Sequence, residues 1–167
     1  SEMAEESTIA KSQLNSPFKF DPNEQRTRLK ISELDIHSIS DNGHLTSSVV
    51  DAYFTLVKQM NRKALVKSTT AEKVLLFSSR VAEKIFRENA HPNSRVSIFT
   101  YDLVFFPLNF GAFWIVLLVN LQEKTVSLYN PSRNELDKER LLITLFEYLR
   151  RQYHKQFKAD IGLTSFR

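Results

Sequence analysis

The sequence predicts an α/β domain in which helices pack on a mixed or antiparallel sheet of about four strands. The main observation is a long apolar region over residues 103–134, which contains the only tryptophan of the 167 residues. Three segments of it, residues 103–107, 113–121 and 125–129, are rich in Val, Leu, Phe or Tyr and are separated by polar or glycine-containing breaks, as in an antiparallel meander. The second segment is apolar at nearly every position, so helices are expected on both faces of the sheet.

The N-terminal part predicts a tail followed by two helices. Residues 1–25 are polar and predict a flexible tail, which leaves residues 26–167 as a single domain. Ser32 and Asp35, three residues apart, resemble a capping pair that opens a short helix. From residue 46 to residue 60, apolar side chains recur at intervals of three and four, which predicts a helix buried along one face. These side chains are Val49, Val50, Tyr53, Phe54, Val57 and Met60.

The remaining segments complete the predicted order of elements. Residues 61–73 are mostly polar and basic and predict a loop, residues 74–77 a short strand or buried turn, and residues 79–88 a helix. Ser132 and Glu135 form an S-x-x-E capping box, which is followed by a predicted amphipathic helix over residues 139–156. Residues 160–166 are a candidate last strand. The side chains of the last helix expected to lie across the meander are Leu142, Leu145, Phe146 and Leu149.

Composition excludes several classes of function. The formal net charge of +4 is spread along the chain, so nucleic-acid binding has no support from a basic stripe. The sequence has no cysteine, which excludes disulfides, thiolate metal sites and a cysteine nucleophile within these residues. The four histidines are far apart and only three glycines occur, so neither a metal site, a phosphate loop nor a cofactor is expected. No apolar run reaches the ~18 residues of a membrane span, and no signal region is seen, so an intracellular location is expected.

A basic cluster lies at the end of the last predicted helix. Cations in this position stabilise the negative end of the helix dipole, which is the simpler explanation. The alternative is a patch that binds an acidic partner. The cluster consists of Arg150, Arg151, His154, Lys155 and Lys158.

The meander resembles the catalytic core of the ubiquitin-like-protein-specific cysteine peptidases, the SUMO/sentrin-specific protease family. In that family a strand ending near a proline leads to a catalytic His-Trp pair, and a catalytic Asp follows at the end of a later strand. Here Pro107, the Phe113-Trp114 pair and Asn130 stand at these positions with the spacing kept. Residues 28–60 also resemble the opening segment of the family, its Trp-Leu-Asn-Asp signature and its following helix. The resemblance implies a papain-like α+β cysteine-peptidase fold over about residues 27–166, without the cysteine-side segment.

The catalytic positions are degenerate under this resemblance, and no catalytic residue is expected. Phe113 replaces the histidine base, and its ring has no ionisable site to take a proton from a thiol. Asn130 replaces the aspartate and lacks the charge that would hold an imidazolium. The signature tryptophan becomes His44, and only Leu45 of the four signature residues is kept. The family's Gln-x-x-x-x-x-Cys-Gly segment does not occur in the sequence.

Trp114 has two interpretations. In the resembled family, the tryptophan beside the catalytic histidine covers the tunnel that holds the Gly-Gly tail of the substrate, so its retention would preserve tail binding. A lone tryptophan in an apolar strand is more often a core residue, and we expect that role here.

The resemblance implies a pseudopeptidase that acts as a protein-protein interaction or scaffold module, with SUMO or another ubiquitin-like protein as a candidate partner. One alternative is an active peptidase subunit completed by another segment or chain. The other is a binder of nucleic acid or of an acidic partner through the basic helix end. The family suggests the nucleus or the cytoplasm, and homo- or hetero-oligomerisation stays open. The candidate binding residues are Trp114, His44, Leu45, Phe113 and Asn130.

Overall fold

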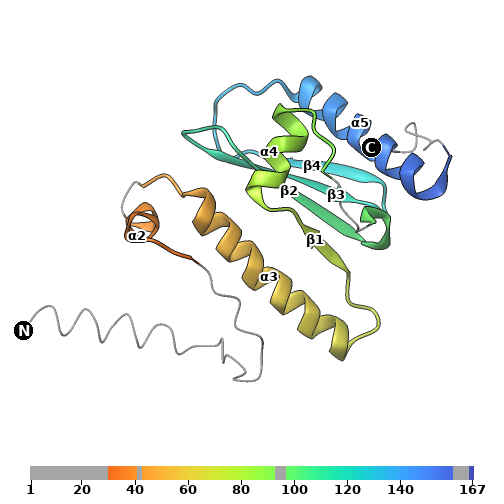
Figure 1. The fold of residues 1–167 in the computed structure, drawn as a ribbon, viewed down its shortest axis with the longest axis horizontal. Coiled ribbons are helices and arrows are strands. Elements are labelled where there is room, and N and C mark those ends of the chain that lie inside the picture. Colours follow the sequence, from red (N-terminus) through yellow and green to blue (C-terminus); the bar gives the residue numbers. More distant parts are fainter. Residues whose placement is uncertain (1–29, 41–42, 93–96, 160–165) are drawn as a thin grey trace, which may run out of the picture.

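The structure is a computed structural model that describes residues 30–40, 43–92, 97–159 and 166–167 (Figure 1). The expected tail of residues 1–25, and the expected last strand except for its final residue, lie outside these described residues. The elements, in chain order, are α2 (Glu33–Ile39), α3 (Ser47–Lys67), β1 (Val74–Leu76), α4 (Ser79–Arg87), a 3-10 turn (Ile98–Thr100), β2 (Leu103–Asn109), β3 (Trp114–Asn120), β4 (Thr125–Tyr129) and α5 (Lys138–Phe157).

The four strands form one mixed sheet in the order β1-β2-β3-β4, which confirms the predicted number of strands and the meander. Strand β1 runs parallel to β2, and the other two pairs are antiparallel. The β2–β3 hairpin closes at the Asn109–Trp114 pair. Its turn contains Gly111 at φ 79°, a left-handed conformation that glycine adopts without steric cost.

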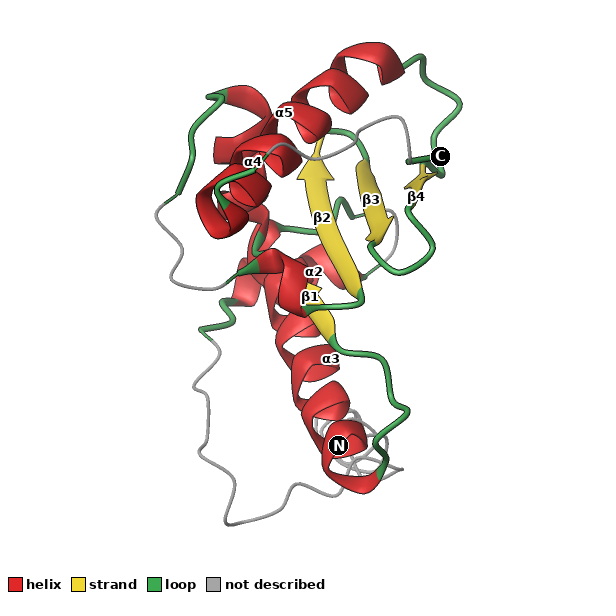
Figure 2. Cartoon of the chain, turned by 90° about the vertical axis from the view of Figure 1, so that its right-hand side faces the viewer, coloured by secondary structure: helices red, strands yellow, loops and turns green. Residues whose placement is uncertain are grey.

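Helices α4 and α5 lie side by side on one face of the sheet, against β2 (Figures 1 and 2). Phe106 is the centre of this packing and is fully buried. Its ring centroid lies 4.9 Å from that of Phe77, 5.5 Å from that of Phe86 on α4 and 5.9 Å from that of Tyr148 on α5. These contacts form the hydrophobic core that joins the two helices to the sheet.

The expectation that helices cover both sheet faces is wrong for the central strand. Burial alternates strictly along β3: Ile115, Leu117 and Val119 are buried, whereas the residues between them are only half-buried. Helix α3 lies beside β1 and contacts α4, so it does not cover the second face of β3 (Figure 2). The apolar residues on that face are consequently left partly accessible.

Helix α3 differs from the prediction in length and in burial. It continues to Lys67, so most of the predicted loop over residues 61–73 is helical. Lysine, arginine and asparagine on an exposed helix surface need no apolar periodicity, which is why the pattern ended earlier than the helix. No described residue of α3 is fully buried, and Tyr53 and Met60 are 64% and 52% exposed. The expected buried face is therefore only partly covered.

The start of α5 also differs from the prediction. Its N-cap is Asp137, whose Oδ1 accepts a hydrogen bond from the Arg140 N–H at 3.0 Å. Ser132 instead accepts a bond from the N–H of Asn134 and lies in a turn before the helix. The S-x-x-E pair is thus not the helix cap, because Glu135 falls three residues before the first helical residue.

The buried face of α5 is rotated slightly from the predicted one. Leu145 and Leu149 are buried and Phe146 packs against the core, as expected. Leu142 is 37% exposed, and Leu141 contacts the core in its place. In the described part of the chain, none of the helices combines the length and the hydropathy that a membrane span requires.

Candidate functional site

The candidate site lies where the segment 43–46 meets the start of β3. Trp114 Nε1 donates a hydrogen bond to the Leu45 carbonyl oxygen at 2.7 Å. Because Ile115 faces the core, Trp114 projects from the opposite face of the sheet. It is half-buried and outside the core cluster, so the expectation that it is a core residue is wrong. Its indole instead joins two segments 69 residues apart in the sequence.

A buried carboxylate fixes the segment 43–46 from the other side. Asp35 is 6% exposed, and its Oδ1 accepts a hydrogen bond from Thr46 Oγ1 at 2.5 Å. Its Oδ2 accepts bonds from the Ser32 N–H and hydroxyl, each at 2.8 Å, which confirms the predicted capping pair. The bond from Thr46, followed by those from Ser32, lowers the pKa of Asp35, because each stabilises the charged carboxylate. The ionised carboxylate therefore links α2 to the N-cap of α3.

Gly43 allows this close approach. A Cβ atom at residue 43 would lie 2.5 Å from the Ser38 carbonyl oxygen, a distance that real Cβ atoms do not adopt. The Gly43 N–H also donates to the Ser40 carbonyl oxygen at 3.0 Å. The chain between α2 and α3 can therefore turn tightly only with glycine at this position.

Phe113 lies immediately before β3, in the turn of the hairpin. Its ring is stacked on that of Phe110, with centroids 5.5 Å apart and an interplanar angle of 11°. The Phe113 carbonyl oxygen accepts a hydrogen bond from the Phe110 N–H at 2.9 Å. The side chain thus serves to stabilise the turn and offers no group that binds or releases a proton.

Asn130 lies at the same end of the sheet, directly after β4. The register pairs Tyr129 with Val116, so Asn130, the next residue, lies beside the start of β3. Its side-chain oxygen accepts a hydrogen bond from the Ser132 N–H at 3.0 Å. The amide therefore closes a local turn of the kind that Asn commonly forms.

Four of the five predicted binding residues lie at the same end of the sheet, and two of them are in contact. Leu45 and Trp114 are in direct contact through a hydrogen bond, whereas Phe113 and Asn130 share the sheet end with them. His44 is exposed and, within the described residues, makes no hydrogen bond or ring contact. In the part of the chain that is described, no group of three or more His, Asp or Glu side chains is arranged to hold a metal ion.

The predicted basic cluster lies at the C-terminal end of α5. Arg150, Arg151, His154 and Lys155 border one hollow of about 380 Å³. Arg151 also contacts the ring of His91, and burial followed by the charge of Arg151 lowers the pKa of that histidine. Lys158 has a different place: it is the C-cap of α5, in a left-handed conformation at φ 53°.

Sequence reasoning missed several polar contacts between residues distant in the sequence. Besides the Trp114–Leu45 bond, one is the Thr46–Asp35 bond described above. The second joins α3 to the start of α4: Asp51 accepts hydrogen bonds from the Ser79 N–H at 2.7 Å and from its hydroxyl at 3.0 Å. Sequence reasoning also missed one pocket, which is bordered by both Arg87 and Arg140. Only an aspartate within an otherwise apolar helical stretch could have signalled the second contact.

Comparison with known proteins gives consistent results. The family model described as "Ulp1 protease family, C-terminal catalytic domain" matches residues 43–167. The chain is similar to a structure described as the crystal structure of the de-sumoylating protease, with 17% identity and a TM-score of 0.68 over 90% of this chain and 61% of that one. It is also similar to the C-terminal Ulp1 protease domain in complex with Smt3, the yeast ortholog of SUMO, with 14% identity and a TM-score of 0.57 over 86% of this chain and 65% of that one. No curated protein matches the chain.

These structural matches establish the fold. At such low identity they carry no further information about activity, and the chain spans about three fifths of the length of the solved chains it matches. Together with the mixed sheet and its flanking helices, they confirm the SUMO-protease type of fold expected from the sequence.

Proposed function

The chain belongs to the Ulp1 protease family, and on this premise we propose that it is a pseudopeptidase that acts as a protein-protein interaction or scaffold module. The observation that carries the proposal is the position and the ring stacking of Phe113. The resemblance places this residue where the family has its catalytic histidine, and its ring is stacked on Phe110 in the hairpin turn. At the expected position of the general base there is thus a phenyl ring that packs on a second phenyl ring.

The chemistry of the site supports the loss of peptidase activity. General base catalysis requires a side chain that accepts a proton at the reaction pH, and a phenyl ring cannot do so. Asn130, at the expected position of the aspartate, uses its side-chain oxygen in a bond to the Ser132 N–H. The 167 residues contain no cysteine that could supply a thiolate. Catalytic units of this kind lose most of their activity when one member is removed, and here Phe113 and Asn130 stand at the expected positions of two members.

We further propose that the partner is a ubiquitin-like protein. The similar Ulp1 domain structure contains Smt3, the yeast ortholog of SUMO. On this chain, apolar side chains remain accessible close to the candidate site: Leu45 is 42% and Tyr129 57% exposed, and Trp114 is half-buried. Accessible apolar and aromatic residues of this kind are typical of protein interfaces.

A peptidase assay tests the first part of the proposal. The purified chain is incubated with SUMO that carries a fluorogenic group at its C-terminus, with an active SUMO protease as positive control. We expect no release above the buffer rate. Release that depends on an added second chain would support the alternative of an active subunit completed in trans, and release by the chain alone would refute the proposal.

Calorimetric titration with SUMO tests the second part. Wild type is compared with Trp114→Ala and with a matched control, Tyr53→Ala, which removes an exposed aromatic residue from α3. We expect saturable binding that Trp114→Ala weakens and Tyr53→Ala leaves unchanged. If SUMO does not bind while a pull-down recovers an unrelated protein that binds saturably, the chain has kept the scaffold function and lost the ubiquitin-like partner.

A second candidate function is the binding of an acidic partner at the basic end of α5. It is favoured by three cationic residues, Arg150, Arg151 and Lys155, which border one hollow together with His154. Duplex DNA is used as the acidic partner in the test. Its affinity for the chain should fall steeply as the salt concentration is raised, because counterions are released on binding. Arg150→Glu combined with Lys155→Glu would abolish it, whereas binding through the apolar site would depend weakly on salt.

The organisation and location of the protein form part of the same proposal. We propose one domain over residues 26–167 preceded by a flexible tail over residues 1–25, in the nucleus or cytoplasm. Limited proteolysis that leaves residues 26–167 intact would support the boundary. Imaging of the tagged protein tests its location, and light scattering of the purified chain tests homo-oligomerisation.

A further inference from the structure

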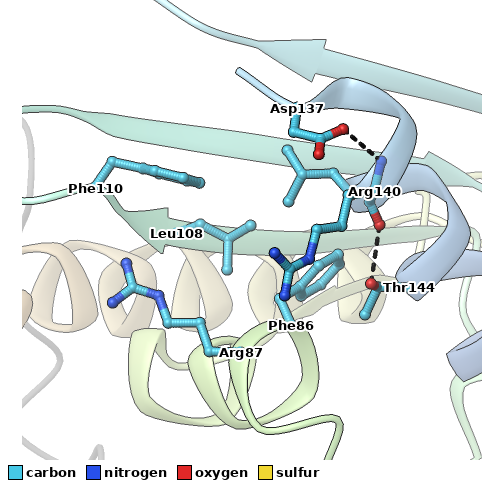
Figure 3. Close-up of a pocket in the computed structure, with 8 residues that line it drawn as sticks. Phe86, Arg87, Leu108, Phe110, Asp137, Arg140 and Thr144 are labelled. Carbon is cyan, nitrogen blue, oxygen red and sulfur yellow. Dashed lines mark hydrogen bonds between the residues drawn. The ribbon is translucent and has the colours of Figure 1, made fainter. Parts of the chain in front are cut away.

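A second pocket, of about 280 Å³, lies between α4, the β2–β3 turn and the first turns of α5 (Figure 3). Its inner surface is apolar. Leu108 of β2 is only 2% exposed, and Phe110 forms the wall towards the hairpin turn. Phe86 and Leu141 complete this apolar surface. Two arginines border the same pocket, one on each helix.

Arg87, on α4, is held in place by three neighbours. Its guanidinium donates a hydrogen bond to the Asn109 carbonyl oxygen, and Nη1 lies 3.9 Å from the Glu83 carboxylate. Its guanidinium carbon is 5.7 Å from the centroid of the Phe110 ring, within the range of a cation–π interaction. The charge of Arg87 is therefore oriented at the edge of the pocket, and most of its five N–H donors remain available.

Arg140, on α5, faces the pocket from the opposite side. Its backbone is engaged by Asp137 and Thr144, at 3.0 Å and 2.9 Å. Its guanidinium makes no hydrogen bond or ion pair with any residue in the described part of the chain. Figure 3 shows this group extending away from the Asp137 carboxylate, over the hollow that Arg87 also borders.

The charges of the pocket indicate what it can bind. Two guanidinium groups border the pocket, and the carboxylate in its lining is that of Asp137, one oxygen of which already accepts the helix N–H. The Glu83 carboxylate, 3.9 Å from Arg87 Nη1, lies outside the lining. A ligand carboxylate between the arginines would form charge-assisted hydrogen bonds, which are stronger than neutral ones. The apolar inner surface would be covered by a neighbouring apolar group. The volume fits one or two side chains rather than a large cofactor.

We propose that this pocket binds a peptide segment in which an acidic residue is followed by an apolar one. The carboxylate lies between Arg87 and Arg140, and the apolar side chain contacts Phe86 and Leu108. A phosphate backbone is a poorer match, because it has no apolar group for this surface and would face the Asp137 carboxylate. This binding site is separate from the Leu45–Trp114 contact and does not depend on the proposed function.

The test is an NMR titration of the ¹⁵N-labelled chain with the peptide acetyl-Gly-Glu-Leu-Gly-amide. We expect saturable shifts of the Leu108, Phe110 and Leu141 amides, with a Kd of about 1 mM or below. The same peptide with Gln in place of Glu should bind at least about tenfold more weakly, since a hydrogen bond to a charged group is lost.

Two variants test whether peptide binding depends on the Arg140 side chain. Arg140→Ala should weaken peptide binding about tenfold or more, whereas Lys138→Ala, which removes an exposed cation from the same helix turn outside the pocket lining, should leave it unchanged. The spectrum of each variant also reports whether the fold is kept. Equal binding of the Glu and Gln peptides, equal effects of the two variants, or shifts produced by inorganic phosphate but not by the peptide would overturn the proposal.

Discussion

The hydrogen bond from Trp114 to Leu45 predicts two different costs for two substitutions of the same side chain. Trp114→Phe keeps an aromatic ring on the sheet and removes only the Nε1 donor, whose bond is 2.7 Å long. Leu45 is 42% exposed, so water can solvate its carbonyl oxygen after the change. The loss should therefore lie near the lower end of the range for one hydrogen bond, at about 0.5–1 kcal/mol.

Trp114→Ala removes the packing of the indole as well. Truncation of a fully buried tryptophan costs about 3–5 kcal/mol. Since Trp114 is only half-buried, we expect about 2–3 kcal/mol for this variant, including the lost hydrogen bond. The order of stability should be wild type, then Trp114→Phe, then Trp114→Ala.

Urea denaturation followed by far-ultraviolet circular dichroism measures both values. With a slope of about 2 kcal/mol/M, the midpoint should fall by about 0.3–0.5 M for Trp114→Phe and by about 1–1.5 M for Trp114→Ala. Equal losses would mean that the hydrogen bond carries the whole effect. No loss for either variant would mean that the tryptophan does not hold the segment 43–46, and the structural role assigned to it would be refuted.

Three further predictions concern the core, the Asp35 cluster and Phe113. Phe106→Ala should lower the free energy of unfolding by about 3–5 kcal/mol, because the ring is fully buried between three aromatic neighbours, and Phe106→Leu should cost clearly less in the same urea experiment. Since the folded-state pKa of Asp35 is lowered, its contribution to stability is complete above the unfolded-state pKa and is lost as pH falls through the folded-state value. The free energy of unfolding of the wild type should therefore fall below about pH 4, and this fall should be smaller in Asp35→Asn. An equal fall in both proteins would contradict the stabilising role of the Asp35 carboxylate. Phe113→His should give no hydrolysis of fluorogenic SUMO, because a restored imidazole alone has neither a thiol nor an aspartate partner; measurable turnover would show that the rest of the unit is supplied from elsewhere.

The sequence alone determined the elements whose signal is local. The strands of the meander follow from runs of β-branched and aromatic residues between turn residues, because each strand and turn is defined within a few positions. The capping pair of Ser32 and Asp35 was predicted correctly for the same reason: a contact between residues i and i+3 is a property of the helix start itself. The resemblance that sets Phe113 at the position of the family's catalytic histidine also comes from the sequence alone, since it depends on residue type and spacing and not on geometry.

The tertiary structure decided which of these surfaces are covered and which distant residues meet. The pattern of α3 predicted an apolar face, but whether that face is buried depends on where the neighbouring elements lie, and Tyr53 and Met60 are left exposed. Helix α5 was expected to pack through Leu142, and a small rotation about its axis exposes that residue instead. The bond of Trp114 to Leu45 joins residues 69 positions apart, and Arg87 and Arg140, which border one pocket, are 53 positions apart. Such pairs have no signature in a single sequence, because only the folded backbone sets the distance between them.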